Sequence, residues 1–331
     1  MPNYEIQRSG GGTQSQRYAG APLMTPGIHP AIPAATYHAD PCPRPSLSSG
    51  IARLLTGRSP RHAWAAHPRL NTAVEPSEPT AAQEEGTLLH GLILGTDVPM
   101  IEVDADDWRG KVAQTARREA RADGAIPILG WRLAMLERCV TAFREQLQHH
   151  ECAAALIAGQ PEASLVWREA DVWCRARPDW LPDDPTDVIY DLKTTGGSAD
   201  PATWERALRE KYAMQAAFYM RGARALGLRP AGFVFLVIET DPPHGLCAFQ
   251  ADAALMGMAE ERVEEAVETW RRCLMEDQWP GYPTRICTVE APGWAIAKHE
   301  EWRIGLSRPR PDNHYVIPSM AELEQSEGFV P

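Results

Sequence analysis

Three short runs of β-branched and aromatic residues, separated by tight breaks, constrain the fold of this chain more than any other feature. They are EASLVWRE (162–169), DVWCRARPDW (171–180) and TDVIYDLKT (186–194). Each run has the composition of a β-strand. Asp200 and Pro201 then supply an N-cap and a first helical residue, which predict a helix over about 201–226. The apolar run GFVFLVIET (232–240) is typical of a buried central strand, so the order predicts an α/β domain with a mixed sheet.

Helical patterns and helix-ending glycines predict further helices around these strands. They cover about 47–56, 84–95, 106–124 and 130–148 before the strands and about 252–276 after them, with one more strand at 245–250. We therefore expect a flexible arm over 1–35, one α/β domain with a helical N-terminal elaboration over 36–280, and an irregular extension over 281–331.

Composition limits the class of protein. The 331 residues are 44% hydrophobic and 23% charged, which is the balance of a soluble globular protein. No apolar run approaches the roughly 20 residues that span a bilayer, and no signal-peptide pattern opens the sequence, so a cytoplasmic protein without a membrane partner is expected. The seven cysteines are scattered, odd in number and free of CxxC pairs. That distribution argues against a disulfide framework, a zinc ribbon or an iron–sulfur cluster.

The charge distribution bears on any nucleic-acid function. The net charge is −11, and the residues from 241 to the end carry 16 acidic and 8 basic side chains. Phosphate binding requires Lys and Arg, so composition alone does not suggest a nucleic-acid partner. If one binds, its contacts are expected from the basic segments 58–62, 116–123 and 221–229, with the acidic helix at 252–276 facing away from it or toward another subunit.

Two aspartates and a lysine suggest a metal site on neighbouring strands. Residues i and i+2 of a strand share a face, so Asp191 and Lys193 point together. Asp179 closes the preceding predicted strand, and a hairpin would bring it near Asp191. Two such carboxylates repel unless a cation lies between them, and Mg²⁺ prefers oxygen ligands. A charged hairpin at a sheet edge remains the alternative interpretation, because the spacing D-x-K alone is a weak motif.

Further polar residues follow the same order of elements. His90 lies in the apolar helix GTLLHGLILG, where it is either a core histidine or a ligand. Tyr212, Gln215 and Tyr219 occupy one face of the helix after the strands. Gln215 within this apolar stripe needs a partner, which is either the backbone or the site.

Taken together, these motifs resemble the PD-(D/E)XK nuclease superfamily, and within it the branch of exodeoxyribonuclease VIII (RecE-type) and RecB-like nucleases. The resemblance runs from about Tyr37 to Trp270. It is carried by YHADPCPRPSLSSGIARLL, GTLLHGLILG, CRARPDW, YDLKTT and YAMQAAFYMRGARALG. It implies a restriction-endonuclease-like αβββαβ core and a divalent metal, Mg²⁺ or Mn²⁺.

The resemblance also implies roles for individual residues. Metal ligation falls to the residues that match His90, Asp179 and Asp191, together with the Leu192 carbonyl. A catalytic role falls to Lys193. The Q-x-x-x-Y motif, Gln215 and Tyr219, would support the site and the DNA end. Cysteine spacing departs from the relatives that hold an iron–sulfur cluster, so none is expected here.

The function that follows is a metal-dependent DNA exonuclease of phage-type recombination, acting 5′→3′ on linear double-stranded DNA. The implied partners are double-stranded DNA ends, a single-strand annealing (RecT-type) protein and further copies of the chain. Two alternatives stay open. One is an endonuclease of the same fold, of the restriction or CRISPR-associated type. The other is a catalytically silent DNA-binding or recombination scaffold, against which the presence of Asp179, Asp191 and Lys193 together argues.

Overall fold

The chain divides into two compact units, Met1–Gly281 and Tyr282–Pro331. The computed structural model describes residues 24–30, 32–72 and 78–307. The predicted N-terminal arm, residues 1–35, lies mostly outside the described residues. The strands and the candidate site all belong to the first unit.

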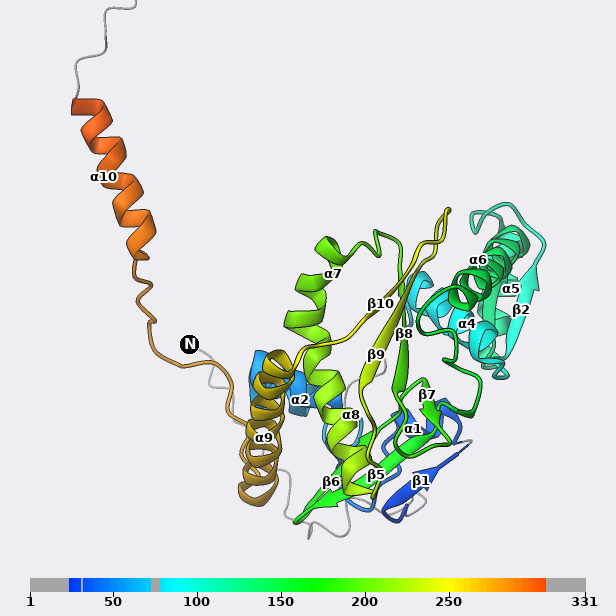
Figure 1. Cartoon of the computed structure of the whole chain (residues 1–331), viewed down its shortest axis with the longest axis horizontal. Helices are drawn as coiled ribbons and strands as arrows, with labels where there is room; N and C mark the ends of the chain where they lie inside the picture. Colours follow the sequence, from blue (N-terminus) through cyan, green and yellow to red (C-terminus); the bar gives the residue numbers. More distant parts are fainter. Residues whose placement is uncertain (1–23, 31, 73–77, 308–331) are drawn as a thin grey trace, which may run out of the picture. The chain divides into compact units, whose positions relative to one another are not determined.

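A five-stranded mixed sheet lies at the centre of the first unit, with the order β10-β9-β8-β7-β4 (Figure 1). Its strands are β4 (Gly159–Pro161), β7 (Trp180–Pro182), β8 (Ile189–Thr195), β9 (Phe233–Glu239) and β10 (Leu246–Phe249). β8 and β9 are parallel, and the other neighbours are antiparallel. All of β9 except its last residue is buried, as expected for a continuous apolar run between two layers of helices. The predicted mixed sheet is therefore confirmed.

A second sheet holds the first two predicted strands, in the order β1-β5-β6. Its strands are β1 (Gly27–His29), β5 (Ser164–Glu169) and β6 (Val172–Ala176). The sequence predicted one strand over 171–180 that ends with Asp179. The observed strand ends at Ala176, and β7 begins only at Trp180, because Pro178 has no N–H to donate to a ladder. Asp179 therefore lies in the link between two sheets.

Helices cover both faces of the five-stranded sheet (Figure 1). One face carries α4 (Ala81–Leu94) and α6 (Gly130–Gln148), and the other carries α2 (Ser49–Gly57), α3 (Pro60–Ala66), α7 (Pro201–Ala207), α8 (Ala213–Ala225) and α9 (Ala253–Glu276). A short helix, α1 (Ala34–His38), precedes them. Successive residues of a strand point to opposite faces, so Phe235 packs with the α8 layer while Leu236 packs with the α4–α6 layer.

The helix predicted over 201–226 is present but interrupted. It begins as expected, with the Asp200 carboxylate accepting the Ala202 N–H at 2.9 Å. A π-helical turn at Leu208–Tyr212 then separates α7 from α8. Such a turn holds one extra residue, which rotates the side chains that follow it, and it often lies at functional sites. Gln215 lies in the first turn after it.

A small βαβ unit between α4 and α6 was not predicted in full. β2 (Met100–Val103) and β3 (Ile126–Leu129) pair in parallel, and α5 (Lys111–Ala122) connects them. The sequence predicted the helix, as 106–124, but neither strand. Each strand has only four residues, three residues of β2 are exposed, and β3 contains Pro127. These features remove the alternation by which strands are recognised in sequence.

The second unit contains the helix α10 (Gly293–Ser307). The sequence predicted an irregular extension over 281–331, so this helix is a correction. Trp294 and Trp302 are exposed on it, and its apolar residues do not form a single stripe. Across the residues described, α10 included, no helix combines the length and apolar character that a membrane span requires.

Candidate active site

Asp191 and Lys193 share one face of β8, as their spacing predicted. This is the face covered by α8, and Asp191 is only 2% exposed. The side chain of Leu192 points to the opposite face and is fully buried among residues of the α4–α6 layer. A carboxylate is thus held deep in the protein beside the middle of a rigid strand.

Asp179 reaches β8 because β7 and β8 pair only briefly. Their ladder consists of one residue pair, Trp180 with Tyr190. Beyond this pair the strands separate, and the Leu192 N–H has no strand partner on this side. The Asp179 Oδ2 atom accepts that N–H at 2.7 Å. The break at Pro178 and the splayed strands together bring the second carboxylate to the main chain between Asp191 and Lys193.

Lys193 and Gln215 occupy the two oxygens of the Asp191 carboxylate. The Lys193 ammonium group contacts Oδ1 and also donates to the Leu192 carbonyl oxygen at 3.1 Å. Gln215 Nε2, from α8, donates to Oδ2 at 3.0 Å. The polar partner that Gln215 requires is therefore Asp191 and not the backbone.

His90 approaches the site from α4, which packs on the face of the sheet opposite to α8. Its Nδ1 atom lies 3.4 Å from Asp179 Oδ1. α4 lies close to the end of β8 at Gly86, where a Cβ atom would be in ordinary van der Waals contact with the Thr194 hydroxyl oxygen, at 3.4 Å. His90 is thus a partner of Asp179 and not a core histidine.

Tyr219, the second residue of the Q-x-x-x-Y motif, lies one turn beyond Gln215. It is buried, and its ring packs edge-on against Phe233 at 5.8 Å. Burial raises the pKa of its hydroxyl group, and Ser49 at the start of α2 opposes that rise. Tyr219 of α8 therefore lies close to the start of α2.

The two carboxyl groups differ in pKa. Burial raises the pKa of Asp191 to about 6, and the charge of Asp179 adds to this, although Lys193 opposes it. Burial acts the same way on Asp179, but the charge and hydrogen bond of His90 hold the pKa of Asp179 below its ordinary value. Burial alone would lower the pKa of Lys193, but Asp191 and Asp179 raise it, so the group is an ammonium cation at neutral pH. The ionised form of Asp179 is therefore stabilised by its partners, whereas Asp191 is costly to ionise.

The donor atoms fit a divalent cation that prefers oxygen. Among the residues described, no three His, Cys, Asp or Glu side chains gather closely enough to enclose a metal. Mg²⁺ does not need such a cage, because it often uses one or two carboxylates and completes its shell with water and phosphate. Asp191 Oδ1 and the Leu192 carbonyl oxygen already share one cation, the ammonium group of Lys193. These two oxygens, with Asp179 beside them, are the fitting ligands, and His90 contacts Asp179.

A small cavity beside Gln215 contains residues that the sequence analysis did not assign to the site. It measures about 110 Å³ and is lined by Ser49, Gly50, Arg53, Lys211, Tyr212, Met214 and Gln215. Ser49 and Gly50 begin α2, where N–H groups lack partners within the helix. Arg53 and Lys211 are exposed cations. The sequence predicted a helix over about 47–56, which contains Ser49, Gly50 and Arg53, but gave no signal that this helix borders the site.

The two arginines of α8 are paired with acidic side chains. Arg221 contacts Glu169 and Glu264, and Arg224 contacts Glu260 at 2.8 Å. Both arginines therefore bind the acidic helix α9, which lies beside them and does not face away from this segment. DNA contacts from segment 221–229 stay a prediction, and Arg229 is its exposed arginine without an acidic partner among the ion pairs of the described residues.

The second basic segment is only partly neutralised. Arg121 of α5 forms two hydrogen bonds, at 2.8 and 2.9 Å, with the Glu84 carboxylate. Arg118 on the same helix is exposed, and so is Arg58 in the first basic segment. These positions stay candidates for phosphate contacts.

Comparison with known proteins agrees with this architecture. Residues 135–291 match a family model described as "PDDEXK-like domain of unknown function (DUF3799)". Among solved structures, the chain is similar to a candidate exonuclease from Eubacterium rectale, with 11% sequence identity and a TM-score of 0.52. The match covers 80% of this chain and 98% of that chain. A phage related exonuclease from Haemophilus somnus 129PT also matches, with 15% identity over 57% of this chain and 95% of that chain. Its TM-score of 0.25 is too low for a structural inference. No curated protein matches the sequence.

The family match and the first structural match assign the fold. Over residues 135–291 the chain is similar to a PDDEXK-like domain, and the first structural match has the same fold, in agreement with the resemblance to the PD-(D/E)XK nuclease superfamily that its motifs carry. The matched segment runs from α6 past α9, and it includes Asp179, Asp191, Lys193 and Gln215. His90 lies outside it, on α4.

Proposed function

We propose that this protein is a metal-dependent deoxyribonuclease that hydrolyses phosphodiester bonds at the ends of linear double-stranded DNA. One observation carries the proposal. Asp179 and Asp191 converge on the main chain at Leu192, where the buried carboxyl group of Asp191 has a pKa of about 6 and an ammonium group rests on it. Such a site is built to hold a cation next to a negatively charged substrate.

Asp179, Asp191 and the Leu192 carbonyl would hold the divalent cation, Mg²⁺ or Mn²⁺, with His90 steadying Asp179. When bound, that cation supplies Lewis-acid stabilisation of the charge that develops on the phosphate. Lys193 would exchange its contact with Asp191 for a contact with the reacting phosphate. Because it is protonated, it would donate to a phosphate oxygen and stabilise the same charge. Gln215 keeps the Asp191 carboxylate oriented through its bond to Oδ2.

The cavity beside Gln215 supports a preference for DNA ends. Ser49, Arg53 and Lys211 offer a hydroxyl group and two cations within a space of about 110 Å³. That set suits a single phosphate group, which helix N-termini and cationic side chains both attract. A terminal phosphate held there would place the neighbouring phosphodiester bond toward Asp191. We propose 5′→3′ polarity on this basis and on the motif resemblance.

The wider role rests on that resemblance to the exodeoxyribonuclease VIII branch. We propose that the protein acts in phage-type recombination, where a single-strand annealing protein would take the strand it exposes. Assembly into a homo-oligomer is part of the same proposal.

Digestion of end-labelled linear duplex tests the proposed activity. We expect release of nucleotides with Mg²⁺, no release with EDTA, and no cutting of covalently closed circles. Asp191→Asn should be inactive, whereas Asp183→Asn, an exposed aspartate in the β7–β8 loop, should match the wild type. Cutting of closed circles would favour the endonuclease alternative. Binding of duplex without any hydrolysis in Mg²⁺ or Mn²⁺ would favour the silent scaffold.

A further inference from the structure

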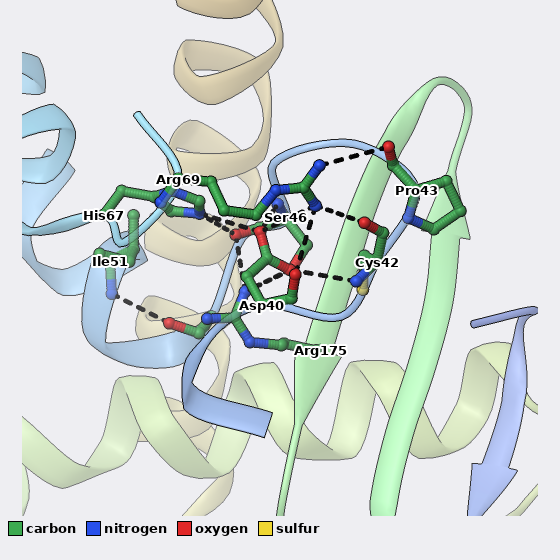
Figure 2. A network of polar contacts seen from close by, with 9 residues as sticks. Asp40, Cys42, Pro43, Ser46, Ile51, His67, Arg69 and Arg175 are labelled. Carbon is green, nitrogen blue, oxygen red and sulfur yellow. Dashed lines mark hydrogen bonds and ion pairs between the residues drawn. The ribbon is translucent and has the colours of Figure 1, made fainter. Parts of the chain in front are cut away.

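A second buried carboxylate, Asp40, lies at the centre of a polar network outside the candidate site (Figure 2). The residue is fully buried. Its Oδ1 atom accepts the Ser46 hydroxyl group at 2.7 Å and lies 3.0 Å from Arg175 Nη1. Its Oδ2 atom accepts the Ser46 N–H at 2.9 Å. Arg175 belongs to β6, four residues before Asp179, so the network begins close in sequence to the site.

Two further residues close the network from the segment after α3. His67 Nε2 lies 3.3 Å from Asp40 Oδ2, and Arg69 Nη1 lies 3.7 Å from it. The Arg69 N–H donates to His67 Nδ1 at 3.2 Å, so the ring proton of a neutral His67 sits on Nε2 and faces Asp40. Arg69 also donates to the Cys42 carbonyl. Figure 2 shows these side chains converging on the loop between Asp40 and Ser46.

The network fixes the chain that enters α2. The Ser46 carbonyl accepts from Arg175 Nη1 at 3.2 Å. The next residue, Leu47, donates to the Trp173 carbonyl at 2.8 Å and accepts the Arg175 N–H at 2.9 Å, as a short parallel bridge to β6. Ser48 then caps α2 by accepting the Ile51 N–H at 3.4 Å. The start of α2 is therefore tied to the edge of β6 through consecutive residues.

α2 carries one wall of the cavity that we assign to a phosphate group. Ser49 and Arg53 line the cavity from α2, and Gln215 lines it from α8. A displacement at the start of α2 would therefore change the distance between the cavity and the carboxylate of Asp191 that Gln215 holds.

We infer that Asp40 and Ser46 are positioning residues, which hold the first turn of α2 so that the terminal-phosphate cavity keeps its place relative to Asp191. This inference rests on the proposed function, because it takes the cavity to be the phosphate site. The alternative is a purely structural role, in which the network adds stability and leaves substrate binding unaffected.

The two ends of α2 provide a matched pair of variants. Ser46 and Ser59 are both buried, and each hydroxyl group forms a hydrogen bond. The Ser59 hydroxyl group contacts His62 Nδ1 at 2.7 Å, beyond the far end of α2. Ser46→Ala removes a bond of the Asp40 network, and Ser59→Ala removes a comparable bond that is not part of it.

The experiment measures cleavage of 5′-phosphorylated and 5′-hydroxyl linear duplex by the full chain, together with amide hydrogen exchange of residues 49–53. Ser46→Ala should raise KM for phosphorylated ends about three- to tenfold and leave kcat within about twofold, because one buried hydrogen bond is lost away from the reacting atoms. It should also speed exchange at the start of α2. Ser59→Ala should change neither the KM for phosphorylated ends nor the hydrogen exchange at the start of α2. Asp40→Asn should act in the same direction as Ser46→Ala, and more strongly.

The outcomes separate the two proposals. If Ser46→Ala leaves KM and exchange unchanged, or if Ser59→Ala has the same effect, the positioning inference is wrong and the nuclease proposal is untouched. If the wild type hydrolyses no DNA, the proposed function is wrong. In that case, amide hydrogen exchange of residues 49–53 in Ser46→Ala and Ser59→Ala still tests whether Asp40 and Ser46 hold the start of α2.

Discussion

The side chains of Asp40 and Asp191 are both buried, at 0% and 2% exposure, yet their surroundings shift their pKa values in opposite directions. Two arginines, a histidine and a serine surround Asp40. Burial alone would raise the pKa of Asp40, but the His67 hydrogen bond and the Arg175 charge hold it below its ordinary value. Burial raises the pKa of Asp191 to about 6, against the opposing charge of Lys193.

The difference separates a buried charge whose neighbours satisfy it from a buried charge at the candidate site that is costly to ionise. A buried carboxylate with enough donors stabilises the fold, and removing it leaves its cations unpaired. A buried carboxylate next to a second carboxylate is costly until another cation arrives, and perturbed pKa values of this kind cluster at active sites. Each prediction below tests whether the two carboxylates really differ in this way.

The largest effect should be on activity. Asp191→Asn or Lys193→Ala should reduce the rate of DNA hydrolysis by about 10²–10³-fold or more, because each removes a charge that acts on the transition state. Single-turnover digestion of end-labelled duplex measures this loss. Normal activity in Asp191→Asn would make the β7–β8 segment a charged hairpin and nothing more.

The next effect concerns folding stability. Asp40→Asn should lower the free energy of unfolding by about 3–5 kcal/mol, because Arg175 is left buried without its carboxylate. Asp191→Asn should leave it unchanged or raise it, since the amide removes the repulsion from Asp179. Urea unfolding at pH 7.5 compares the two variants. Equal destabilisation by Asp40→Asn and Asp191→Asn would contradict the difference between the two buried carboxylates.

The pH dependence of stability should differ in sign. The pKa of Asp191 is raised on folding, so the folded state binds its proton more tightly, and stability should fall by up to about 3 kcal/mol as pH rises from about 4 to about 6. The pKa of Asp40 is lowered, so its contribution is present above about pH 4 and is lost as pH falls below that value. Asp191→Asn should flatten the profile between pH 4 and 6, and Asp40→Asn should flatten it below pH 4. Both profiles come from thermal unfolding across pH.

The smallest effect should come from surface arginines. Charge reversal at Arg118 and Arg58 should weaken DNA binding in Ca²⁺ modestly and reduce its salt dependence, because exposed cations contact phosphates one at a time. Reversal at Arg221 should instead lower stability, since its partners Glu169 and Glu264 would then repel it. A strong loss of DNA affinity from Arg221 with unchanged stability would contradict the observed pairing.

The sequence predicted the parts of this molecule that local patterns encode. Strand alternation places Asp191 and Lys193 on one face, and helical periodicity gave Gly130–Gln148 at its observed bounds. Gln215, in an apolar stripe, was expected to need a partner, and the structure supplies it in Asp191.

Long-range polar contacts escaped the sequence analysis. Arg175 and Ser46 are 129 residues apart, and neither carries a local signal of the other. The same holds for Ser49, which the sequence placed only within a helix over about 47–56. β2 and β3 were missed because parallel pairing across a helix leaves no turn signature.

Thermal unfolding in Mg²⁺ and in EDTA tests the central claim, that Asp191 awaits a divalent cation while Asp40 does not. A ligand that binds only the folded state stabilises it, by about 2.7 kcal/mol at a hundred times its Kd. The account predicts that Mg²⁺ raises the Tm of the wild type and of Asp40→Asn by similar amounts and does not raise that of Asp191→Asn. An equal rise in Asp191→Asn, or no rise in the wild type, would contradict it.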